Sequence, residues 1–320
     1  MNPAMPYRAL GRCGTKVSAF GLGGWVTFGD SLRDVQRVRD IIHKAFEAGI
    51  NFFDTADIYA RGECERIMGE ALRELPRERL VISSKLFWPM SHDVNDRGLS
   101  RKHIMESVER SLKRLGTDYL DLYFCHRFDA ETPLEETARA MDDLVHQGKV
   151  LYWGTSEWSG DQINEVQALC QDHGLYRPQV EQPQYNLLAR RRFEQDVLPA
   201  AREWGMGLVV WSPLASGVLS GKYDQGFPEG SRLARPELQW LKDSVASPQQ
   251  VDHTRKFKVH AEKIGVSRAQ LALAWLLLQP GVSSVILGVT RLEQLQENLA
   301  ALSVDLTRGV VDAVEKLFPD

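Results

Sequence analysis

Cysteine is scarce in this sequence, and histidines are never closely paired. The four cysteines, Cys13, Cys64, Cys125 and Cys170, are scattered along 320 residues without a CxxC pair. This distribution excludes a disulfide-built scaffold and a cysteine zinc site, and it is typical of the reducing cytoplasm. None of the eight histidines belongs to an HxH pair, so a metal-dependent barrel hydrolase would lack its usual ligands. We therefore expect a cytoplasmic protein without a bound metal.

The sequence also lacks a strong charge imbalance and a long apolar run. Lys and Arg number 39 and Asp and Glu 43, which gives a formal net charge of −4. This leaves no global basic field for a nucleic-acid partner. The longest purely apolar run, 271–278, is far shorter than the ~20 residues that span a bilayer, and residues 1–14 lack the apolar core of a secretory signal. We expect neither nucleic-acid binding nor membrane insertion.

Short β-rich apolar runs alternate along the chain with amphipathic helical stretches. The eight runs cover residues 17–24, 51–56, 80–86, 120–126, 150–158, 178–186, 207–214 and 282–289. Runs of this kind are typical of parallel strands that are buried on both faces. No linker rich in Pro, Ser or Gly divides the chain. Eight β/α units in this length predict a single domain over residues 1–320, an α/β fold of the closed (β/α)8 TIM-barrel type.

Glycines punctuate the helical stretches 34–49, 100–116 and 132–148, and we expect Gly49, Gly116 and Gly148 to end these helices. For the third, we expect Thr132 at the N-cap and Pro133 at the first helical position.

Two segments depart from the repeat. Tyr7–Leu10 and the following turn at Gly11–Gly14 predict an N-terminal β-hairpin before the first barrel strand. Residues 215–248 have no clear period, and they predict a long functional loop after the seventh strand.

The carboxyl ends of three successive runs carry an acid, a lysine and a histidine, namely Asp54, Lys85 and His126. The active site of a β/α barrel lies at these ends, and Tyr59 can turn back over the same mouth. A phenol has an ordinary pKa of about 10 and is a poor acid near neutrality, but a neighbouring ammonium lowers its pKa. We expect Lys85 to acidify Tyr59, Asp54 to neutralise Lys85, and His126 to orient a carbonyl.

Each of these residues also has an ordinary structural interpretation. Asp54 could cap the following helix, Lys85 could extend from a strand edge, and His126 could be a hydrogen-bonded core residue. Tyr59 alone could be a surface aromatic. Their coincidence at strand ends favours a proton donor beside a carbonyl, which is half of a carbonyl reduction.

Several motifs in register resemble the aldo-keto reductase family. They are GLGGW (21–25), INFFDTADIY (50–59), ISSKLFW (82–88), YLDLYFCHR (119–127), GTSEWS (154–159), EQPQYN (181–186), WSPLASGVLSGKY (211–223) and VILGVTRLEQLQENL (285–299). Within the family, KLFWP, RGLSRKHIMES and the segment 131–156 are most similar to the voltage-gated potassium-channel β subunits and their bacterial relatives. His126 stands where the channel subunits usually carry Asn, which favours a catalytically competent member.

The resemblance implies a catalytic tetrad of Asp54, Tyr59, Lys85 and His126, with Tyr59 as the general acid. It also implies NADPH bound in extended form across the barrel mouth. The cofactor contacts would come from Gly24, Trp25, Asp54, Ser156, Gln182, Trp211, Ser212, Pro213, Leu214, Ala215, Ser216, Lys222, Arg232, Gly288, Thr290, Gln294, Glu297 and Asn298. The substrate contacts would come from Trp25, Tyr59, Trp88 and His126. Arg232 and Thr290 favour NADPH over NADH, because a 2′-phosphate needs a cation and donors.

The resemblance leaves two functions open. The first is an NADPH-dependent reductase that converts aldehydes or ketones to alcohols. The second is a redox-sensing or regulatory subunit that holds NADPH and docks on a channel or another partner. Two positions depart from the channel-type pattern, with Glu157 in place of Arg and Gly230 in place of Tyr. We expect a small-molecule carbonyl substrate and a homo-oligomer, a tetramer or larger.

Overall fold

Eight short parallel strands close on one another in the computed structural model, which describes residues 4–318. They are β3 (Phe20–Gly23), β4 (Phe52–Asp54), β5 (Val81–Leu86), β6 (Leu120–Cys125), β7 (Val150–Ser156), β8 (Val180–Gln182), β9 (Gly207–Val210) and β10 (Val282–Leu287). Their order around the barrel follows the sequence, and β10 pairs with both β9 and β3. Each predicted run contains one of these strands, so the predicted (β/α)8 TIM barrel is confirmed.

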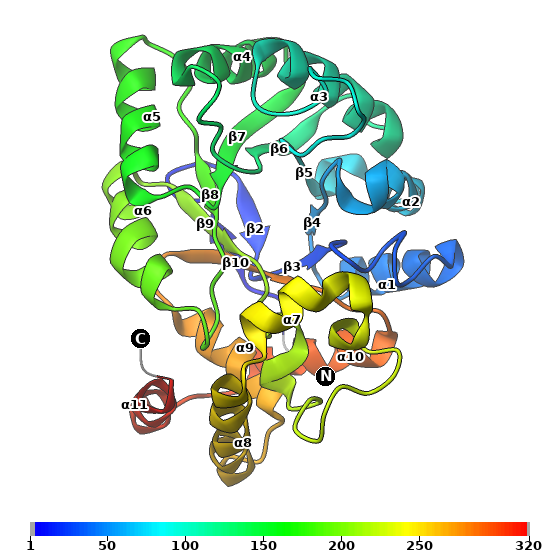
Figure 1. Cartoon of the computed structure of the whole chain (residues 1–320), viewed down its shortest axis with the longest axis vertical. Helices are drawn as coiled ribbons and strands as arrows, with labels where there is room; N and C mark the ends of the chain where they lie inside the picture. Colours follow the sequence, from blue (N-terminus) through cyan, green and yellow to red (C-terminus); the bar gives the residue numbers. More distant parts are fainter. Residues whose placement is uncertain (1–3, 319–320) are drawn as a thin grey trace.

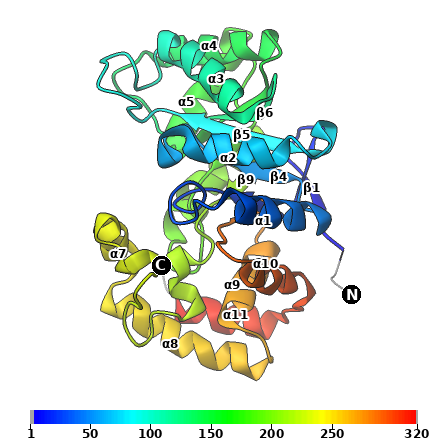
Figure 2. The same ribbon diagram turned by 90° about the vertical axis from the view of Figure 1, so that its right-hand side faces the viewer.

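Helices follow the strands and surround the barrel (Figure 1). The α-helices are α1 (Val35–Glu47), α2 (Glu63–Leu72), α3 (Arg101–Leu115), α4 (Leu134–His146), α5 (Gly160–Asp172), α6 (Leu198–Trp204), α7 (Gln239–Val245), α8 (Pro248–Lys263), α9 (Arg268–Leu278), α10 (Leu292–Leu299) and α11 (Arg308–Leu317). In both views α3 and α4 lie at one end of the molecule and α8 lies at the other (Figure 2).

The helix ends follow local sequence signals, with one exception. Gly116 has a left-handed φ of 66° at the end of α3, and Gly49 and Gly148 have φ of 91° and 69° just after α1 and α4. The expectation for the start of α4 is wrong by one residue, because Pro133 and not Thr132 is the N-cap. The Thr132 hydroxyl instead donates to Asp129 Oδ2 at 2.7 Å.

The predicted N-terminal hairpin is present as antiparallel β1 (Tyr7–Ala9) and β2 (Lys16–Ser18). Leu10 and Val17 are fully buried, and they pack in one apolar cluster with Phe52 and Val81, the first residues of β4 and β5. The hairpin therefore covers the amino-terminal end of the barrel, opposite the rim where the strands end.

The segment after β9 is more ordered than the sequence predicts. It contains the short 3-10 turns η4 (Ala215–Ser220), η5 (Arg232–Ala234) and η6 (Pro236–Leu238), followed by helix α7. The expectation of irregular structure throughout 215–248 is therefore wrong where α7 forms. This helix has only seven residues, too few to produce a helical period in the sequence. Two of them, Leu241 and Val245, are buried, so tertiary packing holds this helix.

Within residues 4–318, no helix combines the length and apolar character that crossing a bilayer demands. In the same range, the four cysteines are free, and no group of three or more His, Cys, Asp or Glu side chains could hold a metal ion.

Candidate active site

A cavity of about 1100 Å³ opens at the carboxyl ends of the barrel strands. Parallel pairing brings these ends to one rim, since Gly23 of β3 lies beside Asp54 of β4, and Asp54 lies beside Ser83 of β5. The segment after β9 and the first residues of α10 complete the walls. The cavity thus lies where the strand-end residues predict an active site.

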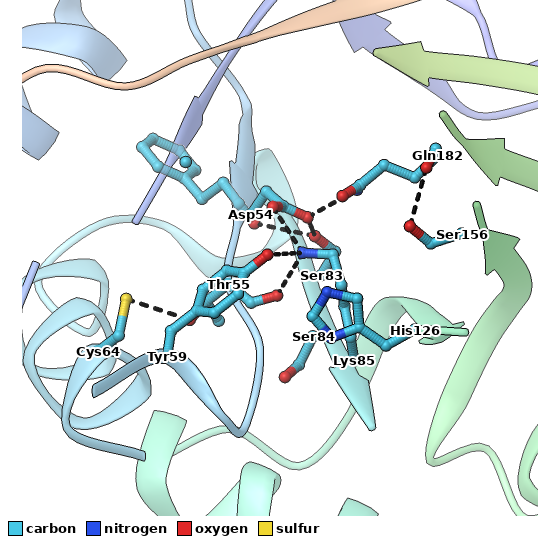
Figure 3. A network of polar contacts seen from close by, with 12 residues as sticks. Asp54, Thr55, Tyr59, Cys64, Ser83, Ser84, Lys85, His126, Ser156 and Gln182 are labelled. Carbon is cyan, nitrogen blue, oxygen red and sulfur yellow. Dashed lines mark hydrogen bonds and ion pairs between the residues drawn. The ribbon is translucent and has the colours of Figure 1, made fainter. Parts of the chain in front are cut away.

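Four side chains from neighbouring elements meet at the floor of this cavity (Figure 3). Lys85 Nζ donates to Asp54 Oδ2 at 2.7 Å, to the Thr55 carbonyl oxygen at 2.7 Å and to Tyr59 Oη at 3.3 Å. These three acceptors match the three protons of an ammonium group. Lys85 is fully buried, and Asp54 supplies the counter-charge that burial requires, as predicted. His126 faces the same group from the end of β6.

Tyr59 reaches the floor because the chain turns sharply after β4. The Thr55 amide donates to the Ser83 carbonyl, which continues the pairing of β4 with β5 towards the rim. Tyr59 then begins the turn η1 (Tyr59–Gly62), in which Ala60 and Arg61 have φ of 48° and 54°. Left-handed values at non-glycine residues cost about 1–2 kcal/mol each and concentrate at functional sites.

The acidity of Tyr59 differs from the expectation. Burial raises its pKa well above the usual value, the negative charge of Asp54 raises it further, and the positive charge of Arg127 opposes both. The prediction that Lys85 acidifies Tyr59 is therefore wrong in direction, because desolvation of the buried phenol dominates its pKa. Burial also lowers the pKa of Lys85, against the effect of Asp54. Tyr59 consequently keeps its proton near neutral pH and holds it ready for donation.

His126 is a neutral imidazole beside that phenol. The ring centres of Tyr59 and His126 are 5.8 Å apart, and the rings are nearly perpendicular. Burial lowers the pKa of His126 well below its usual value, and the charges of Lys85 and Arg127 lower it further. A neutral imidazole can donate one hydrogen bond to a carbonyl oxygen in the cavity.

A second set of bonds connects this group to β8. Gln182 Nε2 donates to Asp54 Oδ1 at 3.0 Å, and Ser83 Oγ donates to the same oxygen at 2.7 Å. Ser156 Oγ donates to the Gln182 carbonyl oxygen at 2.8 Å, as Figure 3 shows. The Asp54 carboxylate is therefore fixed by neighbours from two further strands.

Three basic side chains face the part of the cavity formed after β9 and β10. Lys222, Arg232 and Arg291 line it, and within residues 4–318 none of the three forms an ion pair. Burial lowers the pKa of Lys222 to about 8, and the charges of Arg232 and Arg291 add to this effect. Neighbouring cations in a partly buried cavity cost free energy unless an anion joins them. This end of the cavity therefore fits phosphate groups.

Unpartnered hydroxyl groups lie along the same wall. Among the described residues, Ser212 Oγ and Ser216 Oγ are buried and have no hydrogen-bond partner. Ser212, Ala215 and Ser216 also have positive φ, between 46° and 56°. Buried hydroxyls without partners point to a ligand with polar atoms. Together with the cations, they show that the chain's residues fit a phosphate-bearing dinucleotide such as NADPH.

Nearly all the residues predicted for the site line this one cavity. They are Trp25, Asp54, Tyr59, Trp88, His126, Ser156, Gln182, Trp211, Ser212, Pro213, Leu214, Ser216, Lys222, Arg232, Gly288, Thr290, Gln294, Glu297 and Asn298. Lys85 is fully buried and lies behind this lining, in contact with Asp54 and Tyr59. Gly24 and Ala215 are not among the residues that line the cavity, and their expected cofactor contacts stay a prediction. A Cβ at Gly24 would lie 2.2 Å from Cys64 Sγ, so its glycine is needed for packing on α2, and the Ala215 amide donates to the Ser212 carbonyl.

The sequence pattern does not identify every lining residue. Arg127 and Arg291 directly follow His126 and Thr290, so their position at strand ends was a usable signal. Trp240 lines the cavity from α7 and is 59% exposed. No local signal points to Trp240, because its place depends on how the whole segment after β9 folds.

Residues 19–318 match the model of the Aldo/keto reductase family. The chain belongs to the aldo/keto reductase family. This membership confirms the resemblance seen in the motifs, and it supports an oxidoreductase role for the chain.

Three proteins that are similar in sequence to this aldo/keto reductase are all described as potassium channel β subunits. A "Probable voltage-gated potassium channel subunit beta" of Arabidopsis thaliana is 47% identical over 98% of this chain and 97% of its own length. A protein of the same description from Oryza sativa subsp. japonica is 47% identical over 97% of this chain and 96% of its own. A "Putative voltage-gated potassium channel subunit beta" of Schizosaccharomyces pombe is 44% identical over 99% and 91%. The predicted similarity to channel β subunits is confirmed.

Proposed function

We propose that this aldo/keto reductase is an NADPH-dependent oxidoreductase that reduces aldehydes and ketones to alcohols, with Tyr59 as the general acid. The observation that supports this most is the contact of Lys85 Nζ with Tyr59 Oη, 3.3 Å, at the cavity floor. A buried ammonium against a phenol oxygen stabilises the negative charge that the phenol acquires when it gives up its proton.

The chain's own residues prepare the carbonyl and deliver the proton. NADPH, when bound, supplies the hydride. Neutral His126 donates a hydrogen bond to the carbonyl oxygen and orients it. Tyr59 Oη transfers its proton to the same oxygen as negative charge develops there. Lys85 stabilises the resulting phenolate, and Asp54 keeps Lys85 charged and in place.

The basic end of the cavity would hold the cofactor's phosphates. Ser212, Ser216 and Lys222 would line the pyrophosphate path, and Arg232 would lie over the cofactor. At the adenosine end, Gln294 Oε1 already accepts from the Thr290 amide at 2.8 Å and its hydroxyl at 3.1 Å, which fixes the start of α10. We expect tighter binding of NADPH than of NADH, because the 2′-phosphate adds negative charge beside arginine.

A panel of aldehydes and ketones tests the proposal, with the loss of NADPH absorbance as the readout. We expect steady turnover with at least some aldehydes and none with NADPH alone. No turnover across the whole panel would contradict the reductase assignment.

A regulatory role is the second candidate, and the description of the three relatives as potassium channel β subunits favours it. A regulatory subunit would turn over slowly, release NADP⁺ very slowly and form a stable complex with its partner. A stopped-flow measurement of NADP⁺ release separates the two functions. Fast release with high turnover supports the enzyme, whereas slow release with negligible turnover supports the subunit.

We also propose that residues 1–320 act as one domain in the cytoplasm, and that the protein forms a homo-oligomer, a tetramer or larger. The similarity to channel-type relatives supports the assembly. Light scattering tests it, and a monomer mass would contradict it.

A further inference from the structure

Arg127 is a cation at the substrate end of the cavity that the mechanism does not use. It lines the cavity together with Tyr59, Trp88 and His126. Its guanidinium donates to the carbonyl oxygen of His126, and its central carbon lies 5.7 Å from the centre of the Trp88 ring. These contacts hold the guanidinium at the wall, but they supply no neutralising charge.

Within residues 4–318, Arg127 forms no ion pair. Glu157, the carboxylate that acts on it most, already pairs with Arg192. Glu181 acts on it more weakly, and burial raises the pKa of Glu181 to about 8, so this side chain is mostly uncharged at pH 7. A half-buried cation without a counter-charge costs free energy that a bound anion would recover.

The cofactor's phosphates are poorly placed to supply that anion. Lys222 and Arg232 follow β9, and Arg291 follows β10, whereas Arg127 follows β6. In the closed barrel, β7 and β8 separate β6 from β9, and β3, β4 and β5 separate it from β10. Arg127 therefore lies across the rim from the phosphate-binding end, on the side of the carbonyl-orienting His126.

We propose that Arg127 binds an anionic group, a carboxylate or a phosphate, carried by the aldehyde that this enzyme reduces. The inference rests on the proposed reductase function. The carbonyl lies against Tyr59 and His126, the body of the substrate lies against the Trp88 ring, and the anion meets the guanidinium beyond it. A planar guanidinium suits this task, because its parallel N–H groups match two oxygens of a carboxylate or phosphate.

Three aldehydes that share a benzene ring test this selectivity, each assayed with NADPH. They are 4-carboxybenzaldehyde, 4-formylphenyl phosphate and the uncharged methyl 4-formylbenzoate. We expect kcat/KM of the wild type for at least one charged aldehyde to exceed that for the ester by about 10- to 100-fold, the range of a charged hydrogen-bonded contact. The advantage should lie mainly in KM. A preference for only one anion would support the inference and name the group.

Two substitutions at Arg127 and one elsewhere make the test specific. Arg127→Gln should reduce the ratio of charged to neutral kcat/KM to near one, and Arg127→Lys should retain part of it. The matched control is Arg191→Gln, which should leave the ratio unchanged. Arg191 is exposed, and among residues 4–318 its side chain donates only to Gln195. If Arg127→Gln fails to fold, the test rests on the ratio of charged to neutral kcat/KM in the wild type and in Arg127→Lys.

The outcomes keep the two proposals apart. Equal kcat/KM for the charged and neutral aldehydes in the wild type, or an undiminished preference in Arg127→Gln, overturns the role of Arg127 while the reductase function stands. Absence of turnover with all three aldehydes, and with the wider panel, overturns the reductase function and this inference with it.

Discussion

Trp211 Nε1 donates to Glu157 Oε1 at 2.9 Å, so an acidic residue after β7 fixes an indole that follows β9. The same oxygen accepts from the backbone amide of Gln184 at 2.6 Å, and Arg192 pairs with the other carboxylate oxygen of Glu157. The Trp211 ring in turn lies perpendicular to that of Trp25, with centres 5.5 Å apart. Glu157 therefore positions an aromatic wall of the proposed nicotinamide site.

Removal of the Glu157 carboxylate should weaken NADPH binding. Glu157→Ala leaves the Trp211 indole and the Gln184 amide without their acceptor, and we expect Kd to rise about 10-fold, the value of one such bond. Glu157→Gln keeps an acceptor oxygen and should cost less. Fluorescence titration with NADPH measures both. Glu165→Ala, an exposed position on α5, is the matched control, and an unchanged Kd in Glu157→Ala would contradict this role.

The barrel could be predicted from the sequence because both of its signals are local. Buried strands produce apolar runs, and strand ends carry Asp54, Lys85 and His126 at fixed places in those runs. The 3-10 turns and α7 after β9 leave no such period, so the position of Trp240 could not be foreseen.

Properties that depend on tertiary burial could not be predicted from the sequence either. The spacing of Tyr59 and Lys85 predicts their contact, but the pKa of Tyr59 depends on desolvation by the whole surrounding fold. Gly24 belongs to a motif that predicts a cofactor contact, and only the position of Cys64 behind it shows that this glycine also has a packing role.

The affinity for NADPH should fall as the pH rises above about 8. The pKa of Lys222 is lowered to about 8 by burial and by two neighbouring arginines. A bound phosphate favours the ammonium form, so binding raises this pKa, and at high pH the complex must take up a proton. Measurement of Kd between pH 7 and pH 9 should show weaker binding at the higher value.

Two variants test the origin of that pH dependence. Lys222→Gln should bind NADPH more weakly at pH 7 and lose most of the decline, whereas the exposed Lys263→Gln on α8 should behave as the wild type. If the decline of NADPH affinity with pH persists unchanged in Lys222→Gln, a group other than Lys222 causes it.

Folding stability should decrease as the pH rises from about 4.5 to 8, through Glu181. Burial raises the pKa of this carboxyl from 4.5 to about 8. Between these values the native state keeps a proton that the unfolded chain has lost, so the free energy of unfolding falls by at most about 1.4 kcal/mol per pH unit. Urea unfolding of Glu181→Gln should show a flatter pH profile than the wild type. A profile as steep as that of the wild type would refute this source.

Loss of the Asp54 counter-charge should destabilise the protein and abolish turnover. Asp54→Asn leaves the Lys85 ammonium buried without its anion, and breaking such a pair costs about 3–5 kcal/mol. Ser83→Ala removes only a neutral donor to the same carboxylate and should cost about 1 kcal/mol. Urea unfolding compares the two. Equal stability of the two variants would show that the ion pair is not what holds Lys85.

The turnover of Tyr59→Phe, measured together with its NADPH affinity, decides whether Tyr59 is the proton donor. The substitution removes only the hydroxyl that Lys85 contacts and leaves the ring in place. We predict that Tyr59→Phe binds NADPH as the wild type does and yet reduces aldehydes at least about 100-fold more slowly, the lower range for loss of a general acid. Turnover close to that of the wild type would contradict the assignment of Tyr59 as the proton donor.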